Sequence, residues 1–154
     1  TQAIIGVSEV PVFCGVGGGL TNGVRSASMA AYVEHQGAYG VVCNSKIGLE
    51  TIRDIKSAVE IPVVYTVISE KMDIQPYLDA GVDILNVSGA ARTPEIVAAL
   101  RARYPDMAII ATGGPSDDTI RKTIAAGANA ITYTPPDSGT LLAGIMHAHR
   151  ERYR

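Results

Sequence analysis

Short runs of apolar residues, each bounded by glycine, proline or polar residues, recur along the chain. The runs are continuous and not alternating, which is typical of parallel strands covered on both faces. We predict strands near residues 11–16, 40–44, 62–68, 83–87, 108–112 and 130–134. Between them, apolar residues recur at helical spacing, as in Leu49, Ile52 and Ile55 or in Ile96 and Leu100. Strands that alternate with helices predict an α/β protein with a parallel sheet.

The strands and helices form a repeated unit. Gly37, Gly81 and Gly127 each precede an apolar run and are separated by 44 and then 46 residues. Each of them suits the position just after a helix, where a left-handed backbone is common. Pro11 and Pro62 open a second set of matching strands, at a position where proline is tolerated. The chain therefore predicts α(βα)6, which is three repeats of a (βα)2 unit.

The repeat count predicts an incomplete barrel. Four (βα)2 units would close a (β/α)8 barrel of roughly 250 residues, and residues 1–154 hold three units in one domain. We therefore expect an N-terminal strand–helix pair to be missing. Three units leave two unpaired parallel edges, so we expect a homo-oligomer if nothing precedes Thr1. A six-stranded doubly wound sheet is an alternative, but its strand order reverses midway whereas these units resemble one another.

Composition excludes several classes of function. Apolar residues make up 47% of the chain and charged residues 18%, as in a compact globular protein. A net charge of −2 with a pI near 5.9 gives no electrostatic case for nucleic acid or an anionic membrane. No apolar run reaches the roughly 18 residues that a membrane span needs. Cys14 and Cys43 make no disulfide framework, which favours a reducing, cytoplasmic compartment.

Residues 108–116 form the stretch where we expect a ligand. A short apolar strand is followed by the Gly113-Gly114 turn and by a helix start, with Ser116 as the expected N-cap. Asp117 and Asp118 fall in the first turn, where the helix dipole favours carboxylates. A second helix start is predicted at Thr93-Pro94-Glu95, with Thr93 as its N-cap.

The segments GVGGGLTNG…HQGAYGVVCNS and IIATGGPSDDTIRKTIAAGANAITYTP resemble the phosphate-binding (β/α)8 (TIM) barrel superfamily, of the ribulose-phosphate-binding type. Members include histidine-biosynthetic barrels, thiamine phosphate synthase, sugar-acid aldolases and FMN- or nucleotide-binding barrels related to IMP dehydrogenase. The resemblance implies a phosphate held by backbone N–H groups at Gly113 and Gly114 and after the last strand, at Thr134. It implies a second anion site at Gly17 and Gly18, half a barrel earlier.

The chain departs from the family pattern after the last strand. Residues 134–139 read TPPDSG, where the family often has a Gly-Ser or Gly-Thr pair. Pro135 and Pro136 remove two N–H donors, and Asp137 adds a negative charge beside Asp117 and Asp118. These features disfavour an anion there.

Catalytic groups of a barrel lie at the carboxyl ends of its strands. We expect Asn44, Lys46 and Asn86 to line the pocket, with Lys46 able to form a Schiff base or to pair with phosphate. Two interpretations of Glu70 and Lys71 stay open: they act as a catalytic acid and base, or they form an exposed ion pair. The sequence carries no metal-binding cluster: His147 and His149 lack the i,i+4 spacing of helical metal ligands.

These expectations favour a small-molecule enzyme of the lyase, aldolase or isomerase type that acts on a phosphorylated metabolite. The strand ends carry no Asp or Glu where the histidine-biosynthetic barrels place their acid and base. That shortage favours the alternative of a regulatory barrel that senses a metabolite without turning it over. No cofactor is required by the sequence, and an FMN-binding barrel is a third alternative that would be recognised as a yellow protein.

Overall fold

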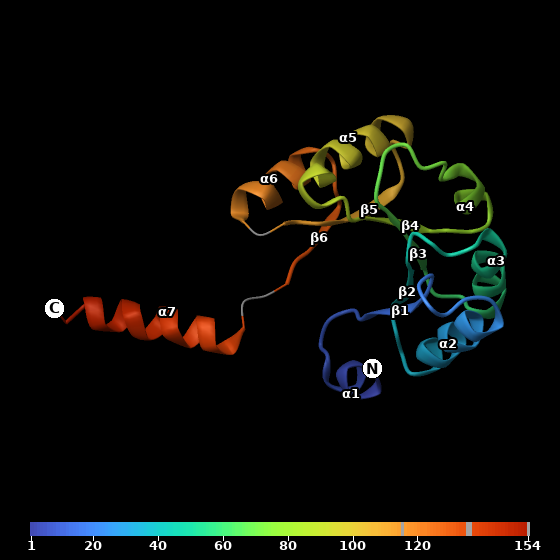
Figure 1. Cartoon of the computed structure of the whole chain (residues 1–154). Helices are drawn as coiled ribbons and strands as arrows, with labels where there is room; N and C mark the ends of the chain where they lie inside the picture. Colours follow the sequence, from blue (N-terminus) through green and yellow to red (C-terminus); the bar gives the residue numbers. More distant parts are fainter. Residues whose placement is uncertain (115, 135–136, 154) are drawn as a thin grey trace.

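The computed structural model describes residues 1–114, 116–134 and 137–153, in which six parallel strands curl into an open half-barrel with helices on its outer side (Figure 1). The predicted strands and the helix after each of them are confirmed. In chain order the elements are α1 (Gln2–Val7), β1 (Phe13–Gly17), α2 (Val24–His35), β2 (Gly40–Cys43), α3 (Leu49–Ala58), β3 (Val63–Val67), α4 (Gln75–Asp79), β4 (Ile84–Val87), the 3₁₀ turn η1 (Ala90–Arg92), α5 (Thr93–Arg103), β5 (Ala108–Thr112), α6 (Asp117–Ala125), β6 (Ala130–Thr132) and α7 (Ser138–Glu151).

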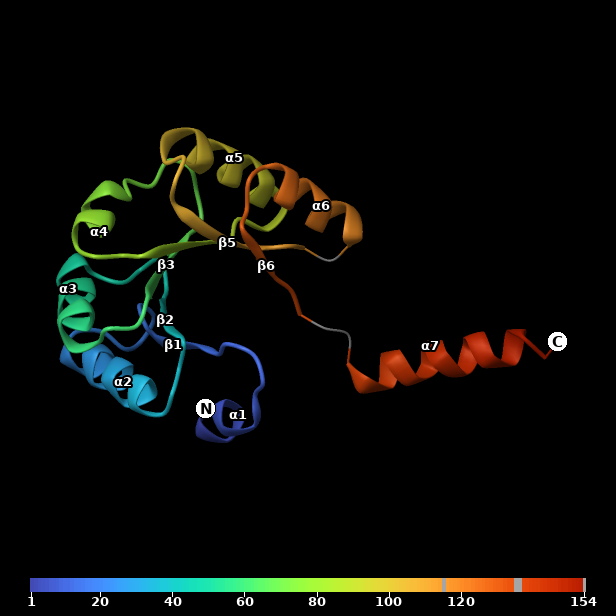
Figure 2. The same ribbon diagram turned by 180° about the vertical axis from the view of Figure 1, so that it is seen from behind.

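The strands follow one another in the sheet in the order β1-β2-β3-β4-β5-β6, and each neighbouring pair is parallel. A doubly wound sheet would reverse this order midway, so that alternative is wrong. The sequential order, with helices outside the curve in both views (Figures 1 and 2), is that of part of a (β/α)8 barrel. The predicted fold class is therefore confirmed.

The repeat extends to individual hydrogen bonds. The three predicted helix-ending glycines have left-handed φ angles: Gly37 93°, Gly81 103° and Gly127 108°. Two residues later in each repeat, a backbone N–H donates to a carbonyl at or beside the start of the preceding strand: Tyr39 to Val12, Asp83 to Val63 and Asn129 to Ile109. Each turn therefore aligns the strand that follows the glycine with its neighbour in the same way.

The two faces of the curved sheet differ in composition. Side chains on the outer face are fully buried under the helices, among them Val16, Val41, Val63, Leu85 and Ile109, all 0% exposed. On the concave face the amino-terminal part of the strands is apolar, and registered rows join Val42 to Val64 and Val64 to Ile84. The core therefore lies between sheet and helices, and the concave face stays open.

Helix α7 extends away from the half-barrel in both views (Figures 1 and 2). Its predicted apolar residues remain exposed: Leu141 51%, Leu142 65%, Ile145 65% and Met146 45%. The Asp137 side chain accepts a hydrogen bond from the Thr140 N–H at 2.9 Å and so caps the first turn. Of the helices described, none is long and apolar enough to cross a membrane.

The start of α5 corrects one prediction. The helix begins at Thr93 itself, directly after η1, so Thr93 is its first residue and not its N-cap. The Thr93 hydroxyl instead accepts a hydrogen bond from the Gly89 N–H at 3.0 Å, across the 3₁₀ turn. The backbone before the helix is already helical, which the sequence pattern did not indicate.

Candidate functional site

Polar side chains occupy the concave face where the strands end. We call Thr66, Asn86, Thr112 and Thr132 the polar edge; the register pairs Thr66 with Asn86 and Thr112 with Thr132. The Asn86 side-chain amide donates to the Thr66 hydroxyl at 3.2 Å. Among the residues that the structure describes, none donates a hydrogen bond to the side-chain amide oxygen of Asn86. The predicted residue Asn86 therefore has an acceptor available on the open face.

The loop after β2 carries the other two predicted pocket residues. The Asn44 side-chain oxygen accepts hydrogen bonds from the Ser45 hydroxyl at 3.2 Å and the Lys46 N–H at 3.4 Å. This Asx-type turn holds the loop at the carboxyl end of the strand. Lys46 is exposed. It therefore lies outside the desolvated pocket in which a Schiff-base lysine is activated.

Two stacked tyrosines, one on β3 and one on α4, bind the loop after β2. The Tyr65 and Tyr77 rings are 4.1 Å apart and nearly parallel, and their hydroxyls donate to the Ser45 and Ile47 carbonyls, both at 3.1 Å. Burial raises the pKa of Tyr65 above its ordinary value, and Tyr77 adds to the shift. The Tyr65 hydroxyl therefore stays protonated, and both hydroxyls act as structural donors.

The Gly113-Gly114 turn is tightly packed. Gly113 is buried and its N–H donates to the Thr132 carbonyl at 2.8 Å, which extends the β5–β6 ladder. A Cβ on Gly113 would lie 2.7 Å from the Ile120 side chain. Gly114 has a φ of 78°, and a Cβ there would lie 2.7 Å from the Thr119 hydroxyl. Glycine is thus required for packing, and the Gly113 N–H is already engaged.

Ser116 caps α6, as predicted. Its hydroxyl accepts from the Thr119 N–H at 3.3 Å, and its own N–H donates to the Thr119 hydroxyl at 3.2 Å, which completes a capping box. The reciprocal bonds leave the Asp117 and Asp118 N–H groups at the helix start without an intrahelical acceptor. The Asp118 carboxylate pairs with Lys122 at 2.7 Å, while Asp117 carries an exposed negative charge.

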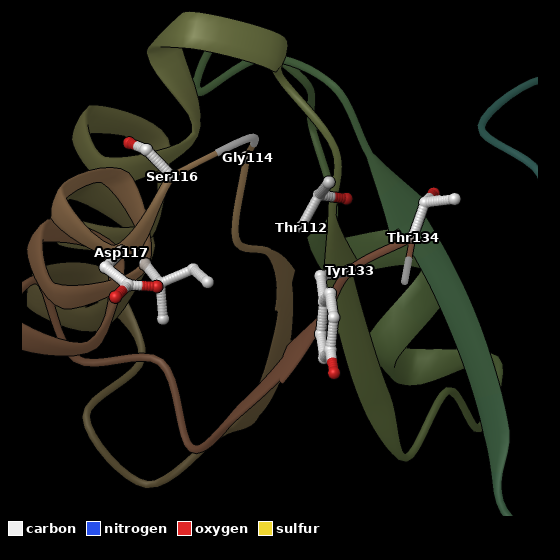
Figure 3. Close-up of a pocket in the computed structure, with 7 residues that line it drawn as sticks. Thr112, Gly114, Ser116, Asp117, Tyr133 and Thr134 are labelled. Atoms are coloured by element: carbon white, nitrogen blue, oxygen red, sulfur yellow. The ribbon is translucent and has the colours of Figure 1, made fainter. Parts of the chain in front are cut away.

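A hollow of about 710 Å³ lies between this helix start and the end of β6 (Figure 3). We call it the α6 hollow; it is lined by Thr112, Gly114, Ser116, Asp117, Ile120, Tyr133 and Thr134. Its volume falls within the range of small-molecule sites. The polar side chains of the described lining residues are hydroxyls and one carboxylate, and none of these residues is cationic. The hollow brings together the predicted residues Gly114 and Thr134, whereas Pro115, Pro135 and Pro136 lie outside the described residues.

A second hollow of about 670 Å³ lies on the other side of the Gly113-Gly114 turn. We call it the α5 hollow, because η1 and the start of α5 form its far wall. Its lining residues are Ala90, Ala91, Thr93, Pro94, Glu95, Thr112, Gly113, Gly114, Thr119, Lys122 and Thr123. The two hollows share Thr112 and Gly114, so the turn is accessible from both sides.

The glycines after β1 pack a loop against the neighbouring strand end. The Gly18 N–H donates to the Thr21 carbonyl at 2.9 Å. Gly18 has a φ of 94°, and a Cβ there would lie 2.7 Å from the Asn44 carbonyl oxygen. A Cβ on Gly17 would lie closer still to the side chain of the buried Ser26. The predicted residues Gly17, Gly18 and Asn44 therefore lie together, with close packing as the visible reason for glycine.

One ion pair at this edge was missed. The Arg92 guanidinium donates to Glu70 at 2.6 Å and joins the loops after β3 and β4. This hydrogen bond holds the pKa of Glu70 below its ordinary value. Glu70 thus pairs with Arg92, although Lys71 is next to it in sequence. The two partners are 22 residues apart, and no local pattern connects them.

The cysteines lie away from the polar edge. Cys14 and Cys43 are free and buried, on strand positions that face the helices. Burial raises the pKa of Cys43 to about 12, so it remains a thiol at neutral pH. The part of the chain that is described contains no group of three or more His, Cys, Asp or Glu side chains placed to hold a metal ion.

Comparison with known proteins places the fold. No protein-family model and no curated protein matches the chain. Among solved structures, it is similar to a protein assigned as a phosphonomutase from Burkholderia cenocepacia J2315, with a TM-score of 0.70, 18% identity, and coverage of 99% of this chain and 72% of that one. It is also similar to a phosphonopyruvate hydrolase, with a TM-score of 0.72, 16% identity, and coverage of 98% of this chain and 63% of that one. A structure named native KDPGal has a TM-score of 0.66 and 20% identity, with coverage of 90% of this chain and 65% of that one.

These similarities establish a barrel-type α/β fold. The chain spans less than two thirds of the phosphonopyruvate hydrolase and KDPGal chains. At 16–20% identity the likeness carries the fold and not the activity. The chemistry has to be argued from the residues at the strand ends.

Proposed function

We propose that this protein is a small-molecule enzyme of the lyase, aldolase or isomerase type that acts on a phosphorylated metabolite. The observation that carries the proposal is the α6 hollow, which opens at the carboxyl ends of β5 and β6 beside the polar edge. Active sites of (β/α)8 barrels lie at this end of the strands. Structural neighbours named phosphonomutase and phosphonopyruvate hydrolase support a substrate with phosphorus or a small acid.

In this proposal the phosphate binds beside the Gly113-Gly114 turn. Its donors are the Gly114 N–H, the free N–H groups of the first turn of α6, and the Thr134 hydroxyl. Backbone N–H groups at a helix start form a natural anion site. The Gly113 N–H donates to the neighbouring strand, so Gly113 donates no hydrogen bond to the phosphate. Without a side chain, it lets the phosphate come close to the backbone. Asp117 opposes the negative charge and would limit affinity for a dianion.

The remaining predicted residues are assigned to the rest of the pocket. Asn86 offers its amide carbonyl to a substrate hydroxyl, while Asn44 and Lys46 border the concave face after β2. Gly17 and Gly18 are proposed as a second anion site, where the Gly18 N–H is already engaged with Thr21. A ligand there would therefore be held by the neighbouring N–H groups of the loop.

A regulatory barrel that senses such a metabolite is the second candidate. The observation that favours it is the chemistry of the polar edge, which consists of hydroxyls and one amide. Proton transfer in this class of reaction needs a carboxylate, histidine or lysine within reach of the substrate. A sensor needs binding alone.

A thermal-shift screen of phosphosugars and phosphorylated acids, followed by turnover assays on each hit, separates the two candidates. Stabilisation with turnover is expected for the enzyme, and stabilisation without turnover would leave the sensor. Thr134→Val should weaken a phosphorylated hit, whereas Ser28→Ala, which removes an exposed hydroxyl on α2, is the control. Sulfate or phosphate that fills another site and leaves the Gly113-Gly114 turn empty would contradict the proposal.

Assembly and location are proposed on separate grounds. The unpaired edges of β1 and β6 and the exposed apolar residues of α7 support a homo-oligomer. The two unpaired buried cysteines support a reducing compartment such as the cytoplasm.

A further inference from the structure

The proposed function uses the α6 hollow and leaves the α5 hollow without a role. The α5 hollow is lined by two side chains of opposite charge. Glu95 comes from the first turn of α5, on one wall, and Lys122 comes from α6, on the other. The two helices pack against each other. The volume of about 670 Å³ falls within the range of small-molecule sites.

The surface between the two charged residues is made of small residues. The turn η1 contributes Ala90 and Ala91, the start of α5 contributes Pro94, and the Gly113-Gly114 turn contributes backbone. These residues bring no charge and little side-chain volume. The middle of the α5 hollow therefore suits an apolar group of a few carbon atoms.

The threonine hydroxyls of the walls are engaged within the protein. The Thr119 hydroxyl donates to the Ser116 carbonyl at 2.7 Å, and the Thr123 hydroxyl donates to the Thr119 carbonyl at 2.8 Å. The Thr93 hydroxyl accepts from the Gly89 N–H at 3.0 Å. These bonds hold the walls in place, so recognition of a ligand falls mainly to the two charged side chains.

Both charged side chains are available to a ligand. The Lys122 ammonium has three donors and pairs with Asp118 at 2.7 Å, while its side chain is 66% exposed. Within the described residues, no donor is hydrogen-bonded to the Glu95 carboxylate, and Arg92 interacts with it through charge. Arg92 itself is bonded to Glu70. Neither Asp118 nor Arg92 lines the hollow, so the charges that face its interior are those of Glu95 and Lys122.

We propose that the α5 hollow binds a small zwitterion, a free amino acid with an apolar side chain. Its ammonium pairs with Glu95 and its carboxylate with Lys122, while the small residues contact its side chain. A dianion would be repelled by Glu95, a cation would be repelled by Lys122, and a neutral molecule would leave both charges unmatched. The phosphate of the proposed function lies in the α6 hollow, so the two sites are tested independently.

Isothermal titration with three probes that share one branched carbon chain tests the inference. They are L-leucine, isocaproate, which lacks the amino group, and isoamylamine, which lacks the carboxylate. We expect the wild-type protein to bind L-leucine at least ten-fold more tightly than either of the others. Glu95→Gln should make L-leucine and isocaproate bind alike, because the partner of the ammonium is lost. Lys122→Met should make L-leucine and isoamylamine bind alike, because the partner of the carboxylate is lost.

Three further variants serve as controls. Glu50→Gln and Lys71→Met remove exposed charges outside the hollow and should keep the preference for L-leucine. Asp118→Asn frees Lys122 from its present partner and should strengthen the binding of L-leucine.

Equal binding of the three probes by the wild type, or binding of none, would overturn the inference and leave the proposed function standing. An unchanged preference for L-leucine in Glu95→Gln and Lys122→Met would also overturn it. Loss of all three probes to the same extent in these two variants would show a structural role for the charges and overturn it as well.

Discussion

Gly114 shows how one residue at the candidate site is constrained by the backbone. Its φ of 78° and the closeness of the Thr119 hydroxyl both exclude a side chain. We expect Gly114→Ala to lower the free energy of unfolding by about 1–3 kcal/mol, because a left-handed alanine and a displaced cap both cost energy. Urea denaturation measures the effect. Gly19→Ala is the matched control, since a Cβ there meets nothing within 4 Å.

If Gly114→Ala and Gly19→Ala were equally stable, the turn would not depend on the left-handed residue. The same comparison bears on the ligand site, because Gly114 lines both hollows. A loss of phosphate binding larger than the loss of stability would indicate close contact of the anion with the backbone.

Cys43 predicts how stability depends on pH. Burial raises its pKa from 9.0 to about 12. Below pH 9 the thiol is protonated in both states, but between pH 9 and 12 only the unfolded chain ionises. Rising pH therefore favours unfolding by linkage. We expect the free energy of unfolding to fall by about 1 kcal/mol between pH 9 and 10 from this group alone.

Urea denaturation of Cys43→Ala across the same pH range checks this origin. The variant is less stable overall but should lose less stability between pH 9 and 10 than the wild type. Val41→Ala, a neighbouring buried truncation on the same strand, should keep the wild-type pH dependence. Identical pH slopes for all three proteins would refute the assignment to Cys43.

At the scale of elements, two repeats use the same side-chain device to align their strands. The Asn129 side-chain oxygen accepts from the Ile109 N–H at 2.9 Å and from Arg101 at 2.7 Å. In the preceding repeat, Asp83 accepts from the Val63 N–H at 2.8 Å and from Lys56 at 2.7 Å. An acceptor, a strand N–H and a helix cation thus recur at equivalent positions.

This equivalence predicts which substitutions are tolerated. Asn129→Ala removes the acceptor of the Ile109 N–H and of Arg101, so we expect it to cost about 1–3 kcal/mol of stability. Asn129→Asp copies the neighbouring repeat and should be close to the wild type. Thermal and urea denaturation of the two variants measure the difference. Equal destabilisation by Ala and Asp would show that the shared acceptor is not what aligns β5 and β6.

At the scale of the whole molecule, the half-barrel leaves large surfaces uncovered. The edges of β1 and β6 are unpaired in the sheet, and the apolar side chains of α7 are exposed. Exposed apolar patches of this kind mark association surfaces. We therefore expect light scattering after size exclusion to give a mass above 16.1 kDa for this chain.

Substitutions on α7 test whether this helix takes part. Leu142→Asp with Ile145→Asp places two charges on the apolar face and should shift the chain toward the monomer. His147→Asp, an exposed residue on another side of the helix, should leave the mass unchanged. A strictly monomeric wild-type chain would contradict the prediction of an oligomer.

Much of the architecture could be predicted from local pattern. Continuous apolar runs identified all six strands, and the spacing of Gly37, Gly81 and Gly127 identified the repeat. Ser116 was recognised as a cap because capping depends on residues three apart. These features follow from backbone stereochemistry and short-range burial, which a single sequence expresses directly.

The contents of the site were decided by tertiary structure. The Glu70–Arg92 pair joins the loops after β3 and β4, and the stacked Tyr65 and Tyr77 of β3 and α4 donate to the loop after β2. Neither contact is visible in a local pattern. The sequence pattern indicates anion contacts for the glycines at the ends of β1 and β5, yet a Cβ on any of these glycines would collide with a neighbouring segment. The sequence by itself determined the order and type of the elements, since these depend on local periodicity. Which strand ends meet, and which donors remain free there, was decided by long-range packing that periodicity does not encode.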